Sequence, residues 1–179
     1  MSFESYTTGE TDFASQILRI KSSDPEALFL PNYVNELLLQ VEQCRSLGVD
    51  AQIVGCDSMG FSDPEDTKKI EGAYFSTHFL SETPSDGVRT FVETYRRAFG
   101  RKPSASAALT YDALGLLFEA VKRAGSVDPA AVSKALSGVR SYTGVTGTMN
   151  FNGSADPVKS AVIVRVVEGE ARYRAHVAP

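Results

Sequence analysis

The sequence lacks the features that would place it in several common functional classes. The net charge is −4, so basic residues provide no electrostatic footprint for nucleic acid. No apolar run reaches about 18 residues, which predicts that no segment spans a membrane. The two histidines, His78 and His176, are too few and too isolated to indicate a metal site, and the sequence predicts no cofactor.

Motifs for catalysis are also missing. The chain contains no Walker-type phosphate loop, no GxSxG and no HExxH. No nucleophile and base are clustered in the sequence, so we do not predict an enzyme; a small α/β enzyme is the alternative from another functional class. Hydrophobic residues make up 42% of the chain and charged residues 22%, which is typical of one globular α/β domain.

The amino-terminal stretch MSFESYTTGETDF does not have the composition of a signal peptide. It has neither a basic end nor an apolar core.

The two cysteines are predicted to be free thiols. Cys44 lies near the far end of a predicted helix, and Cys56 follows a predicted strand. About eleven helical residues, or roughly 16 Å, separate Cys44 from the edge where Cys56 lies. A disulfide requires Cα atoms within roughly 7 Å.

The stretch from Leu28 to Asp57 organises the predicted fold. An apolar run at Ala27–Leu30 is followed by a helical pattern that ends at Gly48, and Ile53–Val54 forms a second apolar run closed by Gly55. One face of the helix is apolar, with Val34, Leu37, Leu38 and Val41. Two buried strands joined by a helix predict a right-handed parallel crossover.

Tyr33 and Asp57 are the main candidates for a binding site. Each follows one of the two predicted strands. Ligands on parallel sheets collect at the carboxyl ends of the strands, where a ring and a carboxylate could hold a small cationic or zwitterionic solute. The alternatives are that the Tyr33 ring packs on the sheet and that Asp57 caps a turn. Asn32 and Ser58 lie beside these residues and could bond a ligand, although such side chains more often bond the local backbone.

Outside residues 28–57, predicted strands and helices alternate less regularly along the chain. Helices are predicted after Thr11, after Asp63-Pro64, after a capping box at Thr83–Asp86, over Ala105–Ala124, and from Asp128-Pro129 to Leu136. Strands are predicted at Phe3–Tyr6, Ala73–Phe75, Thr148–Phe151, Ala161–Val167 and Ala171–Ala175, the last two forming a hairpin, and residues 137–147 are predicted to be a loop. Three successive helices without an intervening strand suit a piece that packs on a sheet supplied from elsewhere.

These segments resemble one known family. TDFASQILRIKSSDPEALFL, ALTYDALGLLFEAVKRAG and TGTMNFNGSADPVKSAVIVRVVEGE are similar to segments of the type I periplasmic solute-binding proteins of ABC transporters, the branched-chain amino-acid class. The resemblance covers about the carboxyl-terminal half of a family member. It implies an incomplete α/β fold with a Rossmann-like parallel sheet lobe, first-lobe helices and a carboxyl-terminal β-hairpin.

The resemblance also implies a domain organisation and a site. Residues 1–77 would form the second ligand-binding lobe, residues 78–151 would return to the first lobe, and residues 152–179 would rejoin the second. Tyr33 and Asp57 match positions that contact ligand in the family. Aspartate replaces the longer glutamate of several relatives, so branched-chain specificity is not assumed. Tyr111 matches a family helix motif and is predicted to pack at the lobe interface.

A function follows from the resemblance as an expectation. It implies capture of an amino acid or similar small molecule between two lobes and delivery to a membrane permease. The parent would be periplasmic or extracellular; since the start is not a signal peptide, we expect a fragment of a longer exported protein, or less favourably a cytoplasmic relative. A ligand-sensing regulator on the same fold is the alternative. Because half of the fold is missing, the chain is also expected to self-associate.

Overall fold

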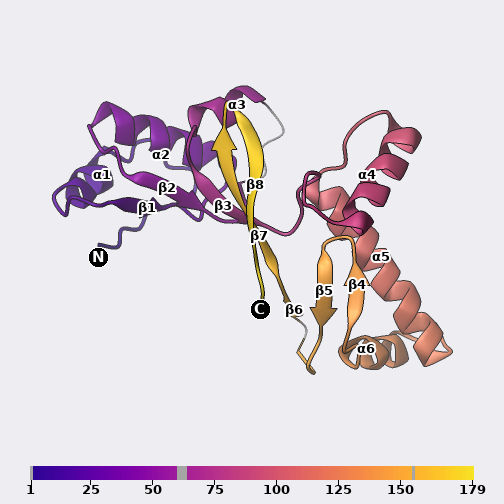
Figure 1. Ribbon diagram of the computed structural model, residues 1–179. Helices are drawn as coiled ribbons and strands as arrows, with labels where there is room; N and C mark the ends of the chain where they lie inside the picture. The colour runs from indigo at the N-terminus through magenta and orange to yellow at the C-terminus, as the bar shows by residue number, and fades with distance from the viewer. Residues whose placement is uncertain (1, 60–63, 155) are drawn as a thin grey trace. The chain divides into compact units, whose positions relative to one another are not determined.

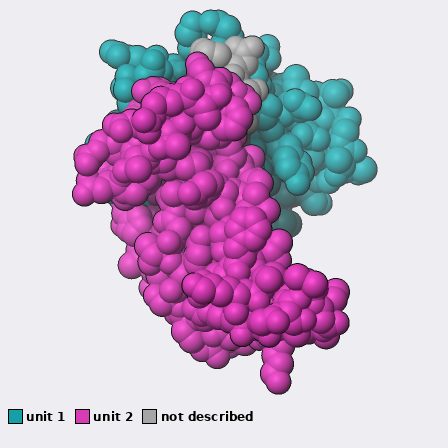
Figure 2. Space-filling view, turned by 90° about the vertical axis from the view of Figure 1, so that its right-hand side faces the viewer, with its two compact units in different colours: residues 1–76, 163–174 teal, residues 77–162, 175–179 magenta. Residues whose placement is uncertain are grey.

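The computed structural model describes residues 2–59, 64–154 and 156–179 (Figure 1). The chain divides into two compact units, shown in Figure 2. Unit 1 comprises residues 1–76 and 163–174, and unit 2 comprises residues 77–162 and 175–179. Elements in chain order are α1 (Ala14–Lys21), β1 (Ala27–Phe29), α2 (Val34–Ser46), β2 (Gln52–Gly55), α3 (Pro64–Lys69), β3 (Tyr74–Thr77), α4 (Asp86–Phe99), α5 (Ala105–Ala124), α6 (Pro129–Ser137), β4 (Tyr142–Gly144), β5 (Gly147–Asn150), β6 (Val158–Lys159), β7 (Ala161–Val167) and β8 (Glu170–Val177).

Unit 1 is built on a sheet whose strand order is β1-β2-β3-β7-β8. β1 pairs with β2 in parallel, with Leu28 opposite Ile53, and β2 pairs with β3 in parallel. The parallel strand–helix–strand unit predicted for residues 28–57 is therefore confirmed. Leu37 and Val41 on α2 are buried, as the apolar face of that helix predicted.

One hydrophobic core cluster of unit 1 joins α1 and α2 to the chain that enters β2. Its buried members are Phe13, Ile17, Cys44, Val49 and Ala51. Both cysteines are free thiols, Cys44 in this core and Cys56 half-buried at the end of β2. The prediction of two free thiols is confirmed.

Three details of unit 1 differ from the predictions or fall outside the description. Residues 3–6 are not a strand. Thr11 is not the cap of α1: Asp12 Oδ1 accepts from the Ala14 N–H at 3.0 Å, and α1 starts after Phe13, whose own N–H donates to Gln43 Oε1. The proposed cap at Asp63 lies outside the described residues.

The hairpin β7–β8 turns through Glu168 and Gly169. Their φ angles are +55° and +69°, the two left-handed conformations of a type I′ turn. Glu71 reaches this turn from the end of α3, and its carboxylate accepts the backbone N–H groups of Glu168 at 3.0 Å and Gly169 at 2.9 Å. The predicted hairpin is confirmed, with a two-residue connection.

Unit 2 combines α4, α5 and α6 with a three-stranded sheet ordered β4-β5-β6. Ala108 of α5 packs with Phe79 and with Val88, Phe91 and Val92, the buried residues of α4. Leu116 of α5 packs with Val139, Met149 and Phe151. α5 covers the predicted span, and its end is marked by Gly125 with φ +61°.

Two predictions for unit 2 are wrong. Residues 137–147 are not all loop, because β4 pairs antiparallel with β5 across a tight turn at Val145 and Thr146. Thr83 does not open α4 with a capping box: the helix begins at Asp86 after Ser85, and Asp86 instead pairs with Arg89 at 2.9 Å. The backbone of Ser85 is extended, so the helix begins two residues later than predicted.

Candidate functional site

The predicted site residues lie in the loops that follow the carboxyl ends of β1 and β2, at one edge of the sheet. The two strands stay paired up to this edge, since the Leu30 N–H donates to the Val54 carbonyl at 2.8 Å. Neighbouring strands lie about 4.8 Å apart. The loops that leave β1 and β2 therefore begin side by side, and we call this pair of loops, residues 31–33 and 56–58, the rim.

Tyr33 stands at the start of α2. It is the residue before the first helical turn, with φ −71° and ψ 158°, and its carbonyl accepts the Leu37 N–H at 3.0 Å. Its side chain is 76% exposed. The ring is therefore not packed on the sheet, and it is accessible to a solute.

Asp57 lies in the turn that follows β2. The Met59 N–H donates to the Cys56 carbonyl at 3.1 Å and closes this turn. Asp57 itself is exposed, whereas Met59 below it is 1% exposed. A buried methionine thus anchors the turn that presents the carboxylate.

Ser58 connects the two loops of the rim. Its hydroxyl donates to the backbone carbonyl of Asn32 at 2.7 Å and lies 3.2 Å from Cys56 Sγ. The structure therefore brings Ser58 and Asn32 together, and both are engaged with the protein itself.

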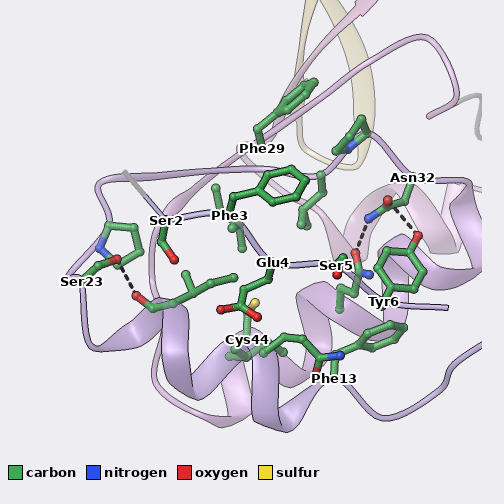
Figure 3. A pocket seen from close by; sticks show the side chains of 18 of the residues that line it. Ser2, Phe3, Glu4, Ser5, Tyr6, Phe13, Ser23, Phe29, Asn32 and Cys44 are labelled. Carbon is green, nitrogen blue, oxygen red and sulfur yellow. Dashed lines mark hydrogen bonds between the residues drawn. The ribbon is translucent and has the colours of Figure 1, made fainter.

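The side chain of Asn32 is also engaged within unit 1. It accepts from the Tyr6 hydroxyl at 2.8 Å and donates to Gln40 Oε1 (Figure 3). Tyr6 in turn meets Phe13 edge to face at 5.3 Å between ring centroids. Asn32 thereby ties the rim to the amino-terminal segment and to α2.

A cavity of about 430 Å³ lies beside Asn32 in unit 1 (Figure 3). Its walls include Phe3, Phe13 and Phe29, and Glu4 is the one charged residue among the described residues that line it. Glu4 is already paired with Arg19 at 2.7 Å. The cavity offers apolar space, without an available charge for a zwitterion, so the rim is the better candidate for an amino-acid site.

The rim has the chemistry of a binding site. A carboxylate accepts charge-assisted hydrogen bonds from an ammonium group, and an exposed aromatic ring can cover the remainder of a small solute. Across residues 2–59, 64–154 and 156–179, no group of three histidine, cysteine, aspartate or glutamate side chains is placed to hold a metal ion. Within the same residues, no helix combines the length and apolar character needed to cross a membrane.

Unit 2 contains a cluster of polar and charged side chains that the sequence analysis did not predict. Asp112 is 1% exposed and accepts the N–H groups of Val145 and Thr146, both at 2.8 Å. Thr146 Oγ1 also accepts a hydrogen bond from Lys159 Nζ at 2.7 Å. Burial lowers the pKa of Lys159, and the charge of Asp112 partly opposes this shift. The hydrogen bonds that join Asp112, Thr146 and Lys159 all lie within unit 2, so we assign this cluster a structural role.

Tyr111, next to Asp112, packs against α4. Its ring centroid lies 5.0 Å from that of Phe91, and the side chain is 58% exposed. This contact lies within unit 2, and the place of Tyr111 at a lobe interface stays a prediction.

A family model described as periplasmic binding protein matches residues 3–171. Among curated proteins, the Leu/Ile/Val-binding protein homolog 7 of Brucella abortus (strain 2308) is 27% identical over 152 residues, which span 80% of this chain and 38% of that protein. The leucine-, isoleucine-, valine-, threonine- and alanine-binding protein of Pseudomonas aeruginosa is 22% identical over 171 residues, spanning 86% of this chain and 41% of that one.

Solved structures agree with these matches. A leucine-binding protein, LivK, from Thermotoga maritima superposes with a TM-score of 0.87 at 31% identity and covers 97% of this chain. The branched-chain amino-acid transporter substrate-binding protein LivJ from Streptococcus pneumoniae, in complex with isoleucine, gives 0.80 at 28% identity and the same coverage. This chain covers 51% of each of those structures and about two fifths of the curated relatives.

Proposed function

The chain belongs to the periplasmic binding protein family, and from that premise we propose that it is the solute-binding component, or a fragment of one, of an ABC uptake transporter. Its role is capture, not chemistry. The proposed ligand is an amino acid or a similar small molecule, and the proposed partner is a membrane permease. The parent protein is proposed to act in the periplasm or outside the cell.

The match over residues 3–171 carries the proposal, and the names of the relatives support the ligand class. The Brucella and Pseudomonas proteins are named for binding leucine, isoleucine and valine, and the Streptococcus structure holds isoleucine. We propose that the Tyr33 ring covers the ligand and that the Asp57 carboxylate accepts hydrogen bonds from the ligand's ammonium group. Asn32 and Ser58 support the rim through the bond between them, which holds the two loops at a fixed spacing.

We propose that the rim is half of the site. Residues 1–77 would serve as one lobe, residues 78–151 would belong to the other, and residues 152–179 would return to the first. Closure of two lobes about a hinge would bury the ligand between them. The groups that hold the ligand's carboxylate would then lie in the part of the family fold that this chain does not span.

Calorimetry of the isolated chain against a panel of amino acids tests the half-site. With one lobe's contacts absent, we expect no binding tighter than about 1 mM, which corresponds to roughly −4 kcal/mol. Micromolar affinity of the isolated chain would show that the site is complete within these 179 residues.

A chimera tests the function itself. In it, the amino-terminal half of the Thermotoga protein precedes this chain, and the same panel is titrated. We expect at least one amino acid to bind, and Asp57→Asn to weaken that binding by about 10- to 100-fold because a charge-assisted hydrogen bond contributes roughly 1.5–3 kcal/mol. Asp50→Asn is the matched control: Asp50 is exposed at the opposite end of β2 and should leave affinity unchanged. A folded chimera that binds nothing in the panel would contradict the proposal.

A further inference from the structure

One end of unit 2 carries basic residues together with an exposed aromatic ring. The stretch from Thr94 to Pro103 holds four basic residues and no acidic one, in a chain whose net charge is −4. It covers the end of α4 and the loop that leads to α5, at the end of unit 2 away from α6 in Figure 1. We call five exposed residues of this stretch the basic tip; they are Arg96, Arg97, Phe99, Arg101 and Lys102.

Most cations of the basic tip have no acidic partner. Among the described residues, the side chains of Arg96 and Arg101 make no hydrogen bond or ion pair, and Arg97 bonds only to the Thr94 hydroxyl at 3.4 Å. Lys102 pairs with Glu82 at 3.2 Å. The tip therefore carries positive charge that the protein itself does not neutralise. Basic residues elsewhere on the surface that do form ion pairs include Arg19, Lys68, Lys69, Arg89, Arg123 and Arg172.

Two carboxylates near the tip offset only part of its charge. A hollow of about 360 Å³ is lined by Arg96 and Lys102 and also by Glu82 and Glu93. Glu82 is the partner of Lys102, and Glu93 forms no ion pair among the described residues. Four cations against two carboxylates leave an excess of positive charge. Arg96 and Lys102 share this space although six residues separate them, so the fold gathers the cations.

The helix dipole accounts for only part of this charge. Cations in the last turn of a helix are favoured by its negative carboxyl end, which explains Arg96 and Arg97. Arg101 and Lys102 lie beyond Gly100, which ends α4 with φ +69°. The dipole effect falls off within the last turn, so it gives no reason for these two cations.

Phe99 is the apolar part of the tip. Its side chain is 63% exposed, and its ring stacks on Tyr95 with 4.5 Å between ring centroids. The Tyr95 ring in turn lies 5.8 Å from that of Phe91, which is buried in a core cluster of unit 2. The Phe99 ring is thus held in place on its inner side while most of its surface faces water.

We propose that the basic tip contacts the surface of a bilayer that contains anionic lipids. Lipid phosphates would neutralise the unpaired guanidinium groups, and the interfacial region would take up the Phe99 ring. Aromatic rings beside cations are typical of segments that lie at a membrane interface. An acidic protein surface would satisfy the charge but gives no reason for the exposed ring. Contact with lipid goes beyond the proposed function, because it requires neither a bound solute nor the permease.

A single tryptophan can report this contact. The chain has no native tryptophan, so Phe99→Trp places one fluorophore at the tip and keeps an aromatic ring against Tyr95. The full chain is titrated with vesicles of equal parts phosphatidylglycerol and phosphatidylcholine, and with vesicles of phosphatidylcholine alone. With the anionic vesicles only, we expect emission at shorter wavelength and acrylamide quenching lower by about twofold or more. Raising the salt from about 0.05 M to about 0.5 M should reverse both changes, because the charges are then screened.

Paired substitutions locate the charge that binds. Arg96→Gln with Arg97→Gln removes two cations from the last turn of α4, and Lys122→Gln with Arg123→Gln removes two from the last turn of α5. The second pair lies about 30 Å along α5 from the tip, since that helix has 20 residues. In co-sedimentation with anionic vesicles at millimolar lipid, the first pair should lower the partition by about tenfold or more. The control pair should lower it by less than about twofold, because distant charges are screened.

Four results would overturn the membrane contact. One is a chain that does not sediment with the anionic vesicles. Another is an equal loss of partition in both paired variants, which would mean that the overall charge of the chain governs binding. The third is partition that leaves the emission of Phe99→Trp unchanged, which would place the contact elsewhere. The last is a response of Phe99→Trp to poly-L-glutamate but not to vesicles, which would assign the tip to an acidic protein.

Folding of each variant is checked by circular dichroism. If the α4 double variant does not fold, Arg101→Gln takes its place, since this residue lies outside the helices and makes no side-chain bond among the described residues. The loss of one cation should lower the partition by about threefold or more. An unchanged partition for a folded Arg101→Gln chain would count against the basic tip.

Discussion

Asp112 and Thr146 share two hydrogen bonds: one carboxylate oxygen of Asp112 accepts the Thr146 backbone N–H at 2.8 Å and the Thr146 hydroxyl at 2.7 Å. The other carboxylate oxygen accepts the Val145 N–H. A helix and the turn between two strands, 34 residues apart, are thereby joined by a buried carboxylate whose two oxygens both accept hydrogen bonds. Gly144 is required beside it, because a Cβ there would lie 2.4 Å from the carboxylate.

Replacing Asp112 by asparagine tests this link. The amide would turn a donor toward one of the backbone N–H groups, leaving it buried without an acceptor. We expect the free energy of unfolding to fall by about 1–3 kcal/mol in a urea titration. Glu119→Gln on the same helix, which removes an exposed pair with Arg123, should change it by less than about 0.5 kcal/mol. Equal effects of the two substitutions would contradict a structural role for Asp112.

The second hairpin turn is held in a similar way by Glu71. Its carboxylate accepts the N–H groups of Glu168 and Gly169, at the turn between β7 and β8. Glu71→Gln keeps the size and one acceptor oxygen, so we expect a loss of roughly 1 kcal/mol in unfolding free energy. Glu170→Gln, at the neighbouring exposed position paired with Arg172, is the control and should be nearly neutral. Hydrogen exchange at the turn amides should increase only in the first variant.

The bonds between Asp112 and the turn from β4 to β5 show why part of the fold could not be predicted. α5 follows from local signals, because Ser104 caps its start, Gly125 ends it and the apolar pattern fills the span. β4 has three residues, and the turn that joins it to β5 donates its N–H groups to Asp112, more than 30 residues earlier. A local pattern holds no information about such a contact.

In the candidate site, too, the features set by topology could be predicted and the contacts between distant residues could not. The positions of Tyr33 and Asp57 at one edge follow from topology, since parallel strands end together. The partners of Asn32 do not follow, because Tyr6 lies 26 residues away and acts from a segment that forms no strand. The ligand contacts themselves stay a prediction.

Gly55, at the end of β2, is predicted to tolerate no side chain. An added Cβ would lie 1.6 Å from the sulfur of Met59, which is 1% exposed, so the methionine side chain would have to shift within the core. Gly55→Ala should lower the free energy of unfolding by about 1–3 kcal/mol through overpacking. Gly87→Ala, in α4 with its nearest atom at 3.8 Å, should instead raise it by about 0.4–1 kcal/mol. A neutral Gly55→Ala would show that the turn beneath Asp57 is loosely packed.

The two thiols should differ in reactivity. Burial raises the pKa of Cys44 above its usual 9.0, with Arg45 partly opposing the shift. Cys44 is 1% exposed and Cys56 is half-buried, so iodoacetamide at pH 8 should modify Cys56 at least about ten times faster in the folded protein and at a similar rate in denaturant. Because the folded state retains the Cys44 proton, this group's contribution to stability is present below pH 9 and is lost as the pH rises through the folded pKa. Rapid labelling of native Cys44 would contradict its placement in the core.

Lys159 should give a pH dependence of the opposite sign. Burial lowers its pKa from the usual 10.5, an effect that the charge of Asp112 partly offsets. At low pH both the folded and unfolded states hold the proton, and the penalty for the buried charge is fully present. As the pH rises through the folded pKa, the folded state loses the proton first, so this contribution increases until the unfolded lysine also titrates.

Lys159→Met isolates that contribution. Unfolding free energies of the parent and the variant are measured from pH 7 to 10.5, and their difference should shift in favour of the parent as the pH rises. Taking the difference cancels groups common to both proteins, including Cys44 and Tyr142, whose pKa values are raised by burial. Lys122→Met, at an exposed position of α5, should give a difference that does not vary with pH. Parallel curves for parent and Lys159→Met would mean that the ammonium of Lys159 is fully hydrated in the folded chain, and that the bond to Thr146 does not draw it out of water.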